Sequence, residues 1–311
     1  MKVLSLCDGI ACGRIALERA GIQVDKYYAS EIKDIAIKVA MSNYPDIIQI
    51  GDVNKISYQN GILYTETGDF NVDHFDLVIF GSPCQSFSNA MRTEYRIGME
   101  DRERSGLFLE CYRVLKEVNP TYFLMENVAS MRNDDKDVIS YLLGVQPILL
   151  DSAKVTGCLR KRYYWTNIPI TTTLEDRHIN LQDLLSFGYT NREKGYCLLA
   201  SDCRPMTCPI KMFFRYYIRH FTNLIFKSKE HFEACVHKLE TKYKGVSARD
   251  LPVNDTDIFE GVRYLRQEEL ERCQTLPEGY TKVLTRDDAA NVIGDGWTVE
   301  IISYIFKHLT K

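Results

Sequence analysis

The distribution of apolar residues along the chain changes about halfway. In the first half, short apolar runs predict β-strands at residues 1–6, 25–30, 75–80 and 121–128. Between them, apolar residues at helical spacing predict helices at residues 15–20, 32–43 and 107–118. Alternating strands and helices indicate a mainly parallel sheet that is covered on both faces. We therefore expect an α/β fold.

The pattern loosens from about residue 171, where threonines and polar loops replace the regular alternation. Strong apolar periodicity returns at the end of the chain and predicts one last helix over residues 287–309. We expect two domains. The first comprises residues 1–172 and is completed by residues 277–311, and the second, smaller one comprises residues 173–276.

The composition is typical of a soluble globular protein, with 45% apolar and 26% charged residues among 311. No apolar run approaches the roughly 20 residues that a membrane-spanning helix needs, and the start MKVLSLCDGI does not resemble a signal peptide. Ten scattered cysteines without a CxxC pair favour reduced thiols over disulfides or a metal site. We expect an intracellular protein without a metal.

Charge is distributed unevenly along the chain. Residues 204–249 carry ten lysines and arginines against three acids, a net charge of +7 in a chain whose total is −3. The segment also interleaves cations with aromatic residues, as in FFRYYIRHF. A local basic patch of this kind is typical of nucleic-acid binding. The alternative is an ordinary solvated charged face.

The octet GSPCQSFS places Cys84 directly after the buried strand predicted at residues 75–80. In open α/β sheets, chemistry occurs at the carboxyl ends of the strands. Pro83 fixes its own φ angle and favours an extended Ser82, so Cys84 would leave the strand on a stiff backbone. This placement suits a nucleophile, although a buried, inert thiol is an equal alternative from the octet alone.

Acidic residues follow three successive predicted strands and indicate a cofactor site. The segment CDGIACG after the first strand contains Asp8 with Gly9 and Gly13, and the glycines allow a close approach of the backbone to a ligand. Glu31 follows the second strand, and Asp52, in IGDV, follows a third short extended run. A carboxylate would repel the phosphates of a dinucleotide, so a positively charged or zwitterionic nucleoside cofactor fits better.

Taken in order, these motifs resemble those of the cytosine-C5 DNA methyltransferases. The matching segments lie in residues 1–170 and 262–311: CDGIACG, Glu31, GSPCQSFS, MENV, the arginine pair of LRKRYYWTNIP, RYLRQEELERCQTLPEGY and IGDGWTVEII. The resemblance implies a Rossmann-like S-adenosylmethionine-dependent methyltransferase fold with a smaller target-recognition domain. Residues 85–104, which are rich in Ser, Arg and Gly, are a candidate lid over the pocket that would receive the target base. Asp295 stands where many bacterial members carry asparagine.

The resemblance also implies the roles of individual residues. Cys84 would be the nucleophile, Glu126 would share a proton with N3 of the base, and Arg160 and Arg162 would hold the carbonyl of the base and a neighbouring phosphate. The implied cofactor-binding residues are Cys7, Asp8, Gly9, Ile10, Glu31, Ile32, Asp52, Val53, Ser82, Pro83, Asp295 and Trp297.

The implied reaction transfers a methyl group from S-adenosylmethionine to C5 of a flipped cytosine in double-stranded DNA, through a covalent bond between Cys84 and C6, and leaves S-adenosylhomocysteine. The implied setting is the cytoplasm of a prokaryotic or phage-infected cell. A cognate restriction endonuclease and the oligomeric state stay open. Two alternatives are a methyltransferase for cytosine in transfer RNA, because one branch of the family acts on transfer RNA with the same core motifs, and an inactive DNA-binding accessory protein. Residues 207–209 also resemble the Thr-Cys-Pro nucleophile motif of a separate group of RNA enzymes.

Overall fold

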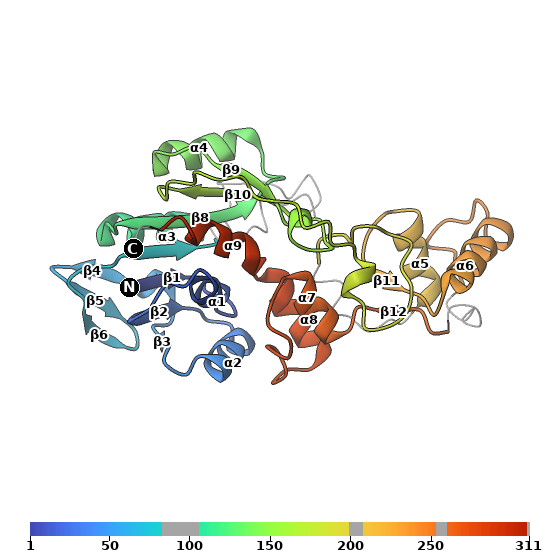
Figure 1. The fold of residues 1–311 in the computed structure, drawn as a ribbon, viewed down its shortest axis with the longest axis horizontal. Coiled ribbons are helices and arrows are strands. Elements are labelled where there is room, and N and C mark those ends of the chain that lie inside the picture. Colours follow the sequence, from blue (N-terminus) through green and yellow to red (C-terminus); the bar gives the residue numbers. More distant parts are fainter. Residues whose placement is uncertain (83–105, 199–207, 253–259, 310–311) are drawn as a thin grey trace. The chain divides into compact units, whose positions relative to one another are not determined.

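The computed structural model describes residues 1–82, 106–198, 208–252 and 260–309, which form two compact units (Figure 1). Unit 1 comprises Met1–Asp151, Lys161–Leu174 and Val299–Lys311, and unit 2 comprises Ser152–Arg160 and Glu175–Thr298. The division differs from the predicted domains at three places, because residues 152–160 and 277–298 belong to unit 2 and residues 173–174 belong to unit 1.

A seven-stranded sheet forms the centre of unit 1, in the order β3-β2-β1-β7-β8-β10-β9. Neighbours from β3 to β8 pair in parallel, whereas β10 pairs antiparallel with both β8 and β9. The strands are β1 (Lys2–Leu6), β2 (Lys26–Ser30), β3 (Ile48–Gln49), β7 (Leu77–Phe80), β8 (Tyr122–Val128), β9 (Ile148–Asp151) and β10 (Lys161–Thr166). The α/β expectation is confirmed.

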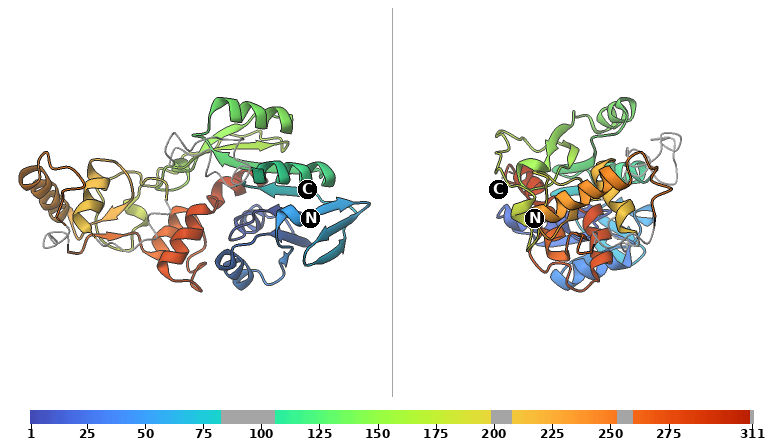
Figure 2. Two further views of the ribbon diagram at one scale, coloured as in Figure 1. Left: turned by 180° about the vertical axis from the view of Figure 1, so that it is seen from behind. Right: turned by 90° about the vertical axis from the view of Figure 1, so that its right-hand side faces the viewer.

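Helices cover the sheet of unit 1, as Figure 1 shows. They are α1 (Cys12–Arg19), α2 (Asp34–Asn43), α3 (Gly106–Val118), α4 (Asn133–Leu143) and α9 (Val299–Phe306). A separate three-stranded sheet consists of β4 (Ser57–Gln59), β5 (Ile62–Thr65) and β6 (Gly68–Asn71). Figure 2 shows this small sheet at the end of unit 1 that is remote from α1 and α2.

The predicted strands and the first three predicted helices are confirmed, with shifts of a few residues at their ends. Strand β7 is buried along its whole length, which fits a continuous LVIF run in a strand that has a neighbour on each side. Gly13 allows α1 to pack closely on this strand, because a Cβ atom there would clash with the side chain of Ile79.

The prediction of one last helix over residues 287–309 is wrong, because two helices occupy this region. Helix α8 (Arg286–Asp295) belongs to unit 2 and α9 belongs to unit 1. Between them Gly296 has φ −70° and ψ 168°, an extended backbone that ends α8. Val292 and Val299 on either side are both buried, so apolar spacing continues across the break.

Unit 2 has little regular sheet. Among its described residues, one pair of short strands is present: β11 (Leu224–Ile225) pairs with β12 (Arg263–Tyr264), and each has two residues. The remaining helices of this unit are α5 (Pro209–Tyr217), α6 (Lys229–Lys242) and α7 (Gln267–Cys273). Its core gathers aromatic and aliphatic side chains from α5, α6 and β11, including Phe213, Tyr216, Phe226 and Leu239.

Candidate active site

The loop after β1 carries four of the predicted cofactor residues, Cys7 to Ile10, in an unusual backbone conformation. Cys7, Gly9 and Ala11 all have positive φ angles, of 54°, 63° and 60°. The amide of Asp8 donates to the carbonyl of Ser30 at 3.0 Å, which ties the loop to the end of β2. Alternate left-handed residues turn the backbone sharply at the carboxyl edge of the sheet, where ligands bind in this architecture.

Asp8 directs its carboxyl group inward from this loop. Its Oδ1 accepts hydrogen bonds from the hydroxyls of Ser5 (2.6 Å) and Tyr27 (2.7 Å). Its Oδ2 is buried and has no hydrogen-bond partner among the described residues. Burial raises the pKa of Asp8 to about 7, and the charge of Glu31 adds to this effect, whereas the two hydroxyls oppose it. A buried carboxyl oxygen without a partner is unusual and marks this strand end as a candidate ligand site.

The acids after β2 and β3 bind nearby backbone amides. Glu31 accepts from the amides of Gly9 (2.8 Å), Ile32 (2.8 Å) and Lys33 (2.9 Å), so its carboxylate connects the ends of β1 and β2. Asp52 caps the short helical turn that follows, accepting from the amide of Asn54 at 3.0 Å. Both carboxylates are thus fixed at the same edge of the sheet as Asp8.

The other predicted cofactor residues of unit 1 differ in exposure. Ile32 is 70% exposed, whereas the side chains of Ile10 and Val53 are buried. Val53 belongs to the core cluster of unit 1, so only its backbone is available to a ligand. The side chain of Ile32 is thus accessible to a ligand, whereas those of Ile10 and Val53 are not.

The end of β7 is tied to β8 by Asn127, a residue that the sequence analysis did not include in the site. Its side-chain amide donates to the carbonyl (3.3 Å) and to the hydroxyl (3.2 Å) of Ser82, and all these groups are buried. Ser82 precedes Pro83 and Cys84, which lie outside the described residues, as does the predicted lid at 85–104. Asn127 lies inside the MENV motif, so its place in that motif could have indicated that it belongs to the site.

Glu126 and Arg162 form a buried ion pair at the carboxyl end of β8. The guanidinium Nε of Arg162 lies 2.8 Å from Oε1 of Glu126, and their side chains are only 13% and 10% exposed. The two residues lie on neighbouring antiparallel strands, where Tyr164 is the register partner of Glu126. Strand pairing therefore sets their separation, and the charged hydrogen bond fixes the orientation of the carboxylate.

Arg160, by contrast, belongs to unit 2 and contacts other partners. Its guanidinium donates to the carbonyls of Gly294 and Gly296, near Asp295 and Trp297. Asp295 is exposed and Trp297 is partly exposed. The structure thus brings Glu126 and Arg162 together in unit 1 and Arg160 together with the predicted closing cofactor segment in unit 2.

Several cations of the basic segment, residues 204–249, lie on the surface of unit 2. Arg219 and Lys227 are exposed, as are Lys229, Lys242, Lys244 and Arg249. The aromatic residues between the cations have a different place, because Phe213 and Tyr216 are buried in the core. Phe213 stacks on Tyr217 with ring centroids 5.8 Å apart. The cations therefore face solvent while the aromatic rings support the fold.

Cys208, the cysteine of the Thr-Cys-Pro motif, lies at the N-cap of α5 and packs against the core of unit 2. Thr207 of the same motif lies outside the described residues. In this position Cys208 acts as a packing residue at a helix start rather than as a residue at a strand exit.

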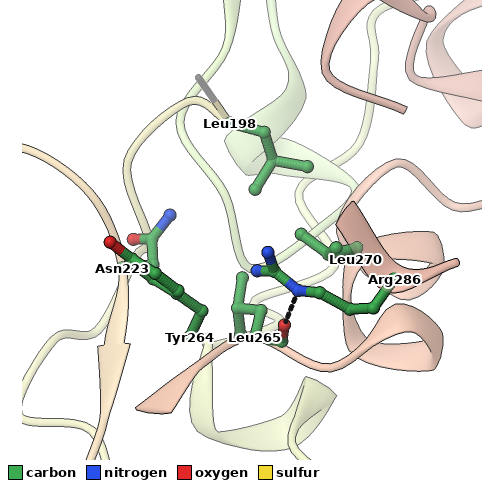
Figure 3. A pocket seen from close by; sticks show the side chains of 6 residues that line it. All are labelled: Leu198, Asn223, Tyr264, Leu265, Leu270 and Arg286. Atoms are coloured by element: carbon green, nitrogen blue, oxygen red, sulfur yellow. Dashed lines mark hydrogen bonds between the residues drawn. The ribbon is translucent and has the colours of Figure 1, made fainter. Parts of the chain in front are cut away.

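One small hollow lies inside unit 2, lined by Leu198, Asn223, Tyr264, Leu265, Leu270 and Arg286 (Figure 3). Arg286 donates to the carbonyl of Leu265 at 3.0 Å across its floor. It leaves no room for a water molecule and includes none of the predicted site residues. We interpret it as imperfect packing. Among the described residues there is no cluster of metal-binding side chains and no helix long and apolar enough to cross a membrane.

Comparison with known proteins shows that the first 143 residues resemble one family. Residues 1–143 match the family model of the C-5 cytosine-specific DNA methylases. The type II methyltransferase M.NgoBV of Neisseria gonorrhoeae is 33% identical over 162 residues, which are 50% of this chain and 35% of that protein. The orphan methyltransferase M.Rho11sI of Bacillus phage rho11s is 38% identical over 138 residues, 44% of this chain and 24% of that protein. The matches thus span little more than a third of the length of these relatives at most.

A solved structure extends the likeness to the whole chain. The DNMT2 variant of Spodoptera frugiperda superposes with a TM-score of 0.63 over 100% of this chain and 99% of that protein, at 16% identity. At this identity the likeness shows the shared fold, which is the Rossmann-like methyltransferase fold expected from the sequence motifs.

Proposed function

We propose that this chain, whose residues 1–143 match the model of the C-5 cytosine-specific DNA methylases, methylates C5 of cytosine in double-stranded DNA. The observation that carries this proposal is the buried pair of Glu126 and Arg162, 2.8 Å apart at the strand end beside Ser82. A carboxylate and a guanidinium fixed together can contact adjacent polar edges of one flipped base. Cys84 follows Ser82 by two residues and would be the nucleophile.

The residues at the sheet edge fit S-adenosylmethionine as the cofactor. The orphaned Oδ2 of Asp8 suits a cationic ligand, and the left-handed backbone at Cys7 and Gly9 lets a ligand approach closely. Glu31 with Ile32, and Asp52 with Val53, would hold the nucleoside part, while Ser82 with Pro83 and Asp295 with Trp297 would complete the site. When bound, this cofactor supplies an electrophilic methyl group.

The protein's own residues would then perform the remaining chemistry. The thiolate of Cys84 forms a bond to C6, which makes C5 nucleophilic. Glu126, oriented by Arg162, shares a proton with N3 and stabilises the charge that develops as sulfur adds. After methylation a base removes the C5 proton, the electron pair reforms the C5–C6 double bond, and Cys84 leaves. Each bond formed to the protein is thus broken again.

Residues 1–172 with 277–311 would form the catalytic part and residues 173–276 the target-recognition part of this proposal. The basic segment of unit 2 would neutralise DNA phosphates. The cytoplasm of a prokaryotic or phage-infected cell is the setting in which such an enzyme meets DNA, and a cognate restriction endonuclease would be its second partner. Sequencing of methylated cytosines in DNA from cells that express the protein tests the activity, with Cys84→Ser as the inactive control.

The DNA partner has its own test. Replacing Arg215, Arg219 and Lys227 with alanine should weaken duplex binding and reduce the slope of log affinity against log salt by as much as roughly 3, since each phosphate contact contributes about 0.9. The matched control replaces three exposed lysines of unit 1, Lys26, Lys38 and Lys116. An unchanged slope in the first variant, or an equal loss in the control, would show that DNA binds elsewhere. Single-stranded and transfer RNA as competitors separate the RNA alternative.

A further inference from the structure

Arg160 is buried and has three hydrogen-bond acceptors inside unit 2. It is 7% exposed. Its Nη2 donates to the carbonyl of Gly296 at 2.8 Å, and its Nη1 lies 3.3 Å from the carbonyl of Gly294 and 3.3 Å from the sulfur of Cys197. A guanidinium has a rigid fork of donors, so two carbonyls of one turn are well matched by it.

These carbonyls lie at the carboxyl end of α8. The amide of Gly296 donates to the carbonyls of Val292 (3.0 Å) and Ile293 (3.2 Å), which closes the last turn of the helix. The final carbonyls of a helix lack helical partners and carry partial negative charge, so a cation there is stabilising. Arg160 therefore acts as a side-chain cap for the end of α8.

The turn is fixed from a second direction by Thr298. Its hydroxyl donates to the side-chain carbonyl of Gln274 at 2.6 Å and accepts from the hydroxyl of Ser152 at 2.8 Å. Residues 294–298 are thus held by Arg160 at one end and by Thr298 at the other. Trp297 lies between these two anchors, in the segment that we propose to contact the cofactor.

Arg160 and Arg162 are two positions apart but bond to different parts of the protein. Arg162 is paired with Glu126, the acid proposed to contact the base. The fork of Arg160 is directed at backbone carbonyls of residues 294 and 296. The chain passes from unit 2 to unit 1 between Arg160 and Lys161. Two arginines that are only two positions apart in the sequence therefore stabilise different parts of the fold.

We infer that Arg160 is a positioning residue that fixes the 294–298 turn for cofactor binding and does not hold the target base or its phosphate. The inference deepens the proposed function and rests on it. Of the two arginines, only Arg162 would then contact the substrate.

Three variants test this inference. Arg160→Met removes the charge and all donors at similar length, Arg160→Lys keeps the charge but loses the fork, and Arg162→Lys is the matched control in the other unit. Circular dichroism melting first confirms that each variant folds. If Arg160→Met does not fold, Arg160→Lys still decides between the two roles.

Two measurements that need no catalysis read out the turn. Calorimetry gives the Kd for S-adenosylhomocysteine. Iodide quenching of fluorescence reports on Trp297, because the only other tryptophan in the sequence, Trp165, is fully buried. A fluorescent duplex gives the affinity for DNA in the same samples.

Losing a charged hydrogen bond typically changes an equilibrium by about tenfold or more. We expect Arg160→Lys to raise the Kd for S-adenosylhomocysteine about tenfold and Arg160→Met to raise it further, each with stronger iodide quenching. Arg162→Lys should leave both values within twofold of the wild type. Cys197→Ala, which removes the sulfur acceptor but keeps both carbonyls, should behave like the wild type.

The opposite pattern would overturn the inference. If Arg160→Lys weakens DNA binding while the Kd for S-adenosylhomocysteine and the quenching stay unchanged, Arg160 is a substrate residue. Failure of the wild-type protein to bind S-adenosylhomocysteine would instead refute the cofactor in the proposed function. In that case the quenching of Trp297 still decides whether Arg160 holds the turn.

Discussion

Buried carboxylates are used differently in the two units. In unit 1, Asp8 has one oxygen that accepts two hydroxyls and a second, buried oxygen without a partner among the described residues. In unit 2, Glu269 is fully buried and accepts from two nitrogens of Arg263 and from the amides of Ser186 and Arg266. The buried carboxyl group at the proposed ligand site thus has an oxygen that accepts no hydrogen bond, whereas both oxygens of the buried carboxylate in unit 2 accept hydrogen bonds.

The difference follows from the amount of regular sheet in each unit. Unit 1 has a seven-stranded ladder that satisfies its own backbone groups. Unit 2 pairs only two residues in each of β11 and β12, so its loop amides need other acceptors. Glu271 supplies one by accepting from the amides of Gly279 (2.6 Å) and Thr281 (2.7 Å). In unit 2, buried carboxylates thus accept the hydrogen bonds of loop amides that strand pairing would satisfy in a sheet.

The largest effect should come from Glu269→Ala. The substitution leaves Arg263 and two backbone amides without their acceptor, which should destabilise unit 2 by about 3–5 kcal/mol. Glu268 is the matched control, because it is the neighbouring acid but is partly exposed, and Glu268→Ala should change stability by less than about 0.5 kcal/mol. Urea unfolding followed by limited proteolysis measures both. Equal stabilities of the two variants would mean that Glu269 is not part of the scaffold.

The same residue predicts a pH dependence. Burial works to raise the pKa of Glu269, but the hydrogen bonds from Arg263 and the backbone amides outweigh it and lower the pKa below its ordinary 4.5. The stabilisation is therefore present above pH 4.5 and is lost as the pH falls through the lowered pKa. Unit 2 of Glu269→Gln should lack this acid-sensitive step.

Asp8 should show the opposite pH dependence and a slightly smaller effect. Its pKa in the folded protein is about 7 because of burial, against an ordinary 3.8, so the folded state keeps the proton that the unfolded chain releases. Stability should fall as the pH rises from about 4 to about 7, by up to roughly 4 kcal/mol at 1.4 kcal/mol per pKa unit. Asp8→Asn should flatten this slope, whereas Asp69→Asn on exposed β6 should not. An identical slope in Asp8→Asn would contradict the account.

A smaller effect on stability, but a larger one on the proposed chemistry, is expected for Asn127→Ala. The variant loses two hydrogen bonds to Ser82, which should cost about 1–2 kcal/mol of stability. Because Ser82 leads into the loop of Cys84, the rate of covalent attachment to DNA should fall much more than the affinity for DNA. Asn54→Ala, at the turn after Asp52, is a control that also loses side-chain hydrogen bonding. Parallel losses of rate and affinity would show that Asn127 has no specific role at the loop.

The sequence was sufficient for those features that depend on local pattern. Continuous apolar runs located four strands of unit 1, β1, β2, β7 and β8. Glu31, just beyond β2, and Glu126, among the last residues of β8, lie at carboxyl ends of strands as expected. Features that depend on tertiary contacts were missed. Spacing alone could not show that Arg160 and Arg162 bond in different units or that Asn127 anchors Ser82.

Periodicity also had two specific limits. The apolar spacing continues across Gly296, because residues on both sides of it are buried. It therefore could not show that α8 ends there and that α9 is a separate helix. It also could not distinguish aromatic residues that contact nucleic acid from those that fill a core, and Phe213 and Tyr216 fill the core of unit 2. Burial against other elements, which is not encoded in spacing, decides both cases.

The most direct test of the central claim is covalent trapping on a duplex that contains 5-fluorocytosine. Fluorine cannot leave C5 as a cation, so the final elimination stalls and the protein should remain bonded to the base in the presence of S-adenosylmethionine. The account predicts a denaturation-resistant adduct that mass spectrometry places on Cys84, is absent from Cys84→Ser and forms far more slowly with Glu126→Gln. An adduct on Cys208, or DNA methylation by Cys84→Ser at a rate similar to that of the wild type, would contradict it.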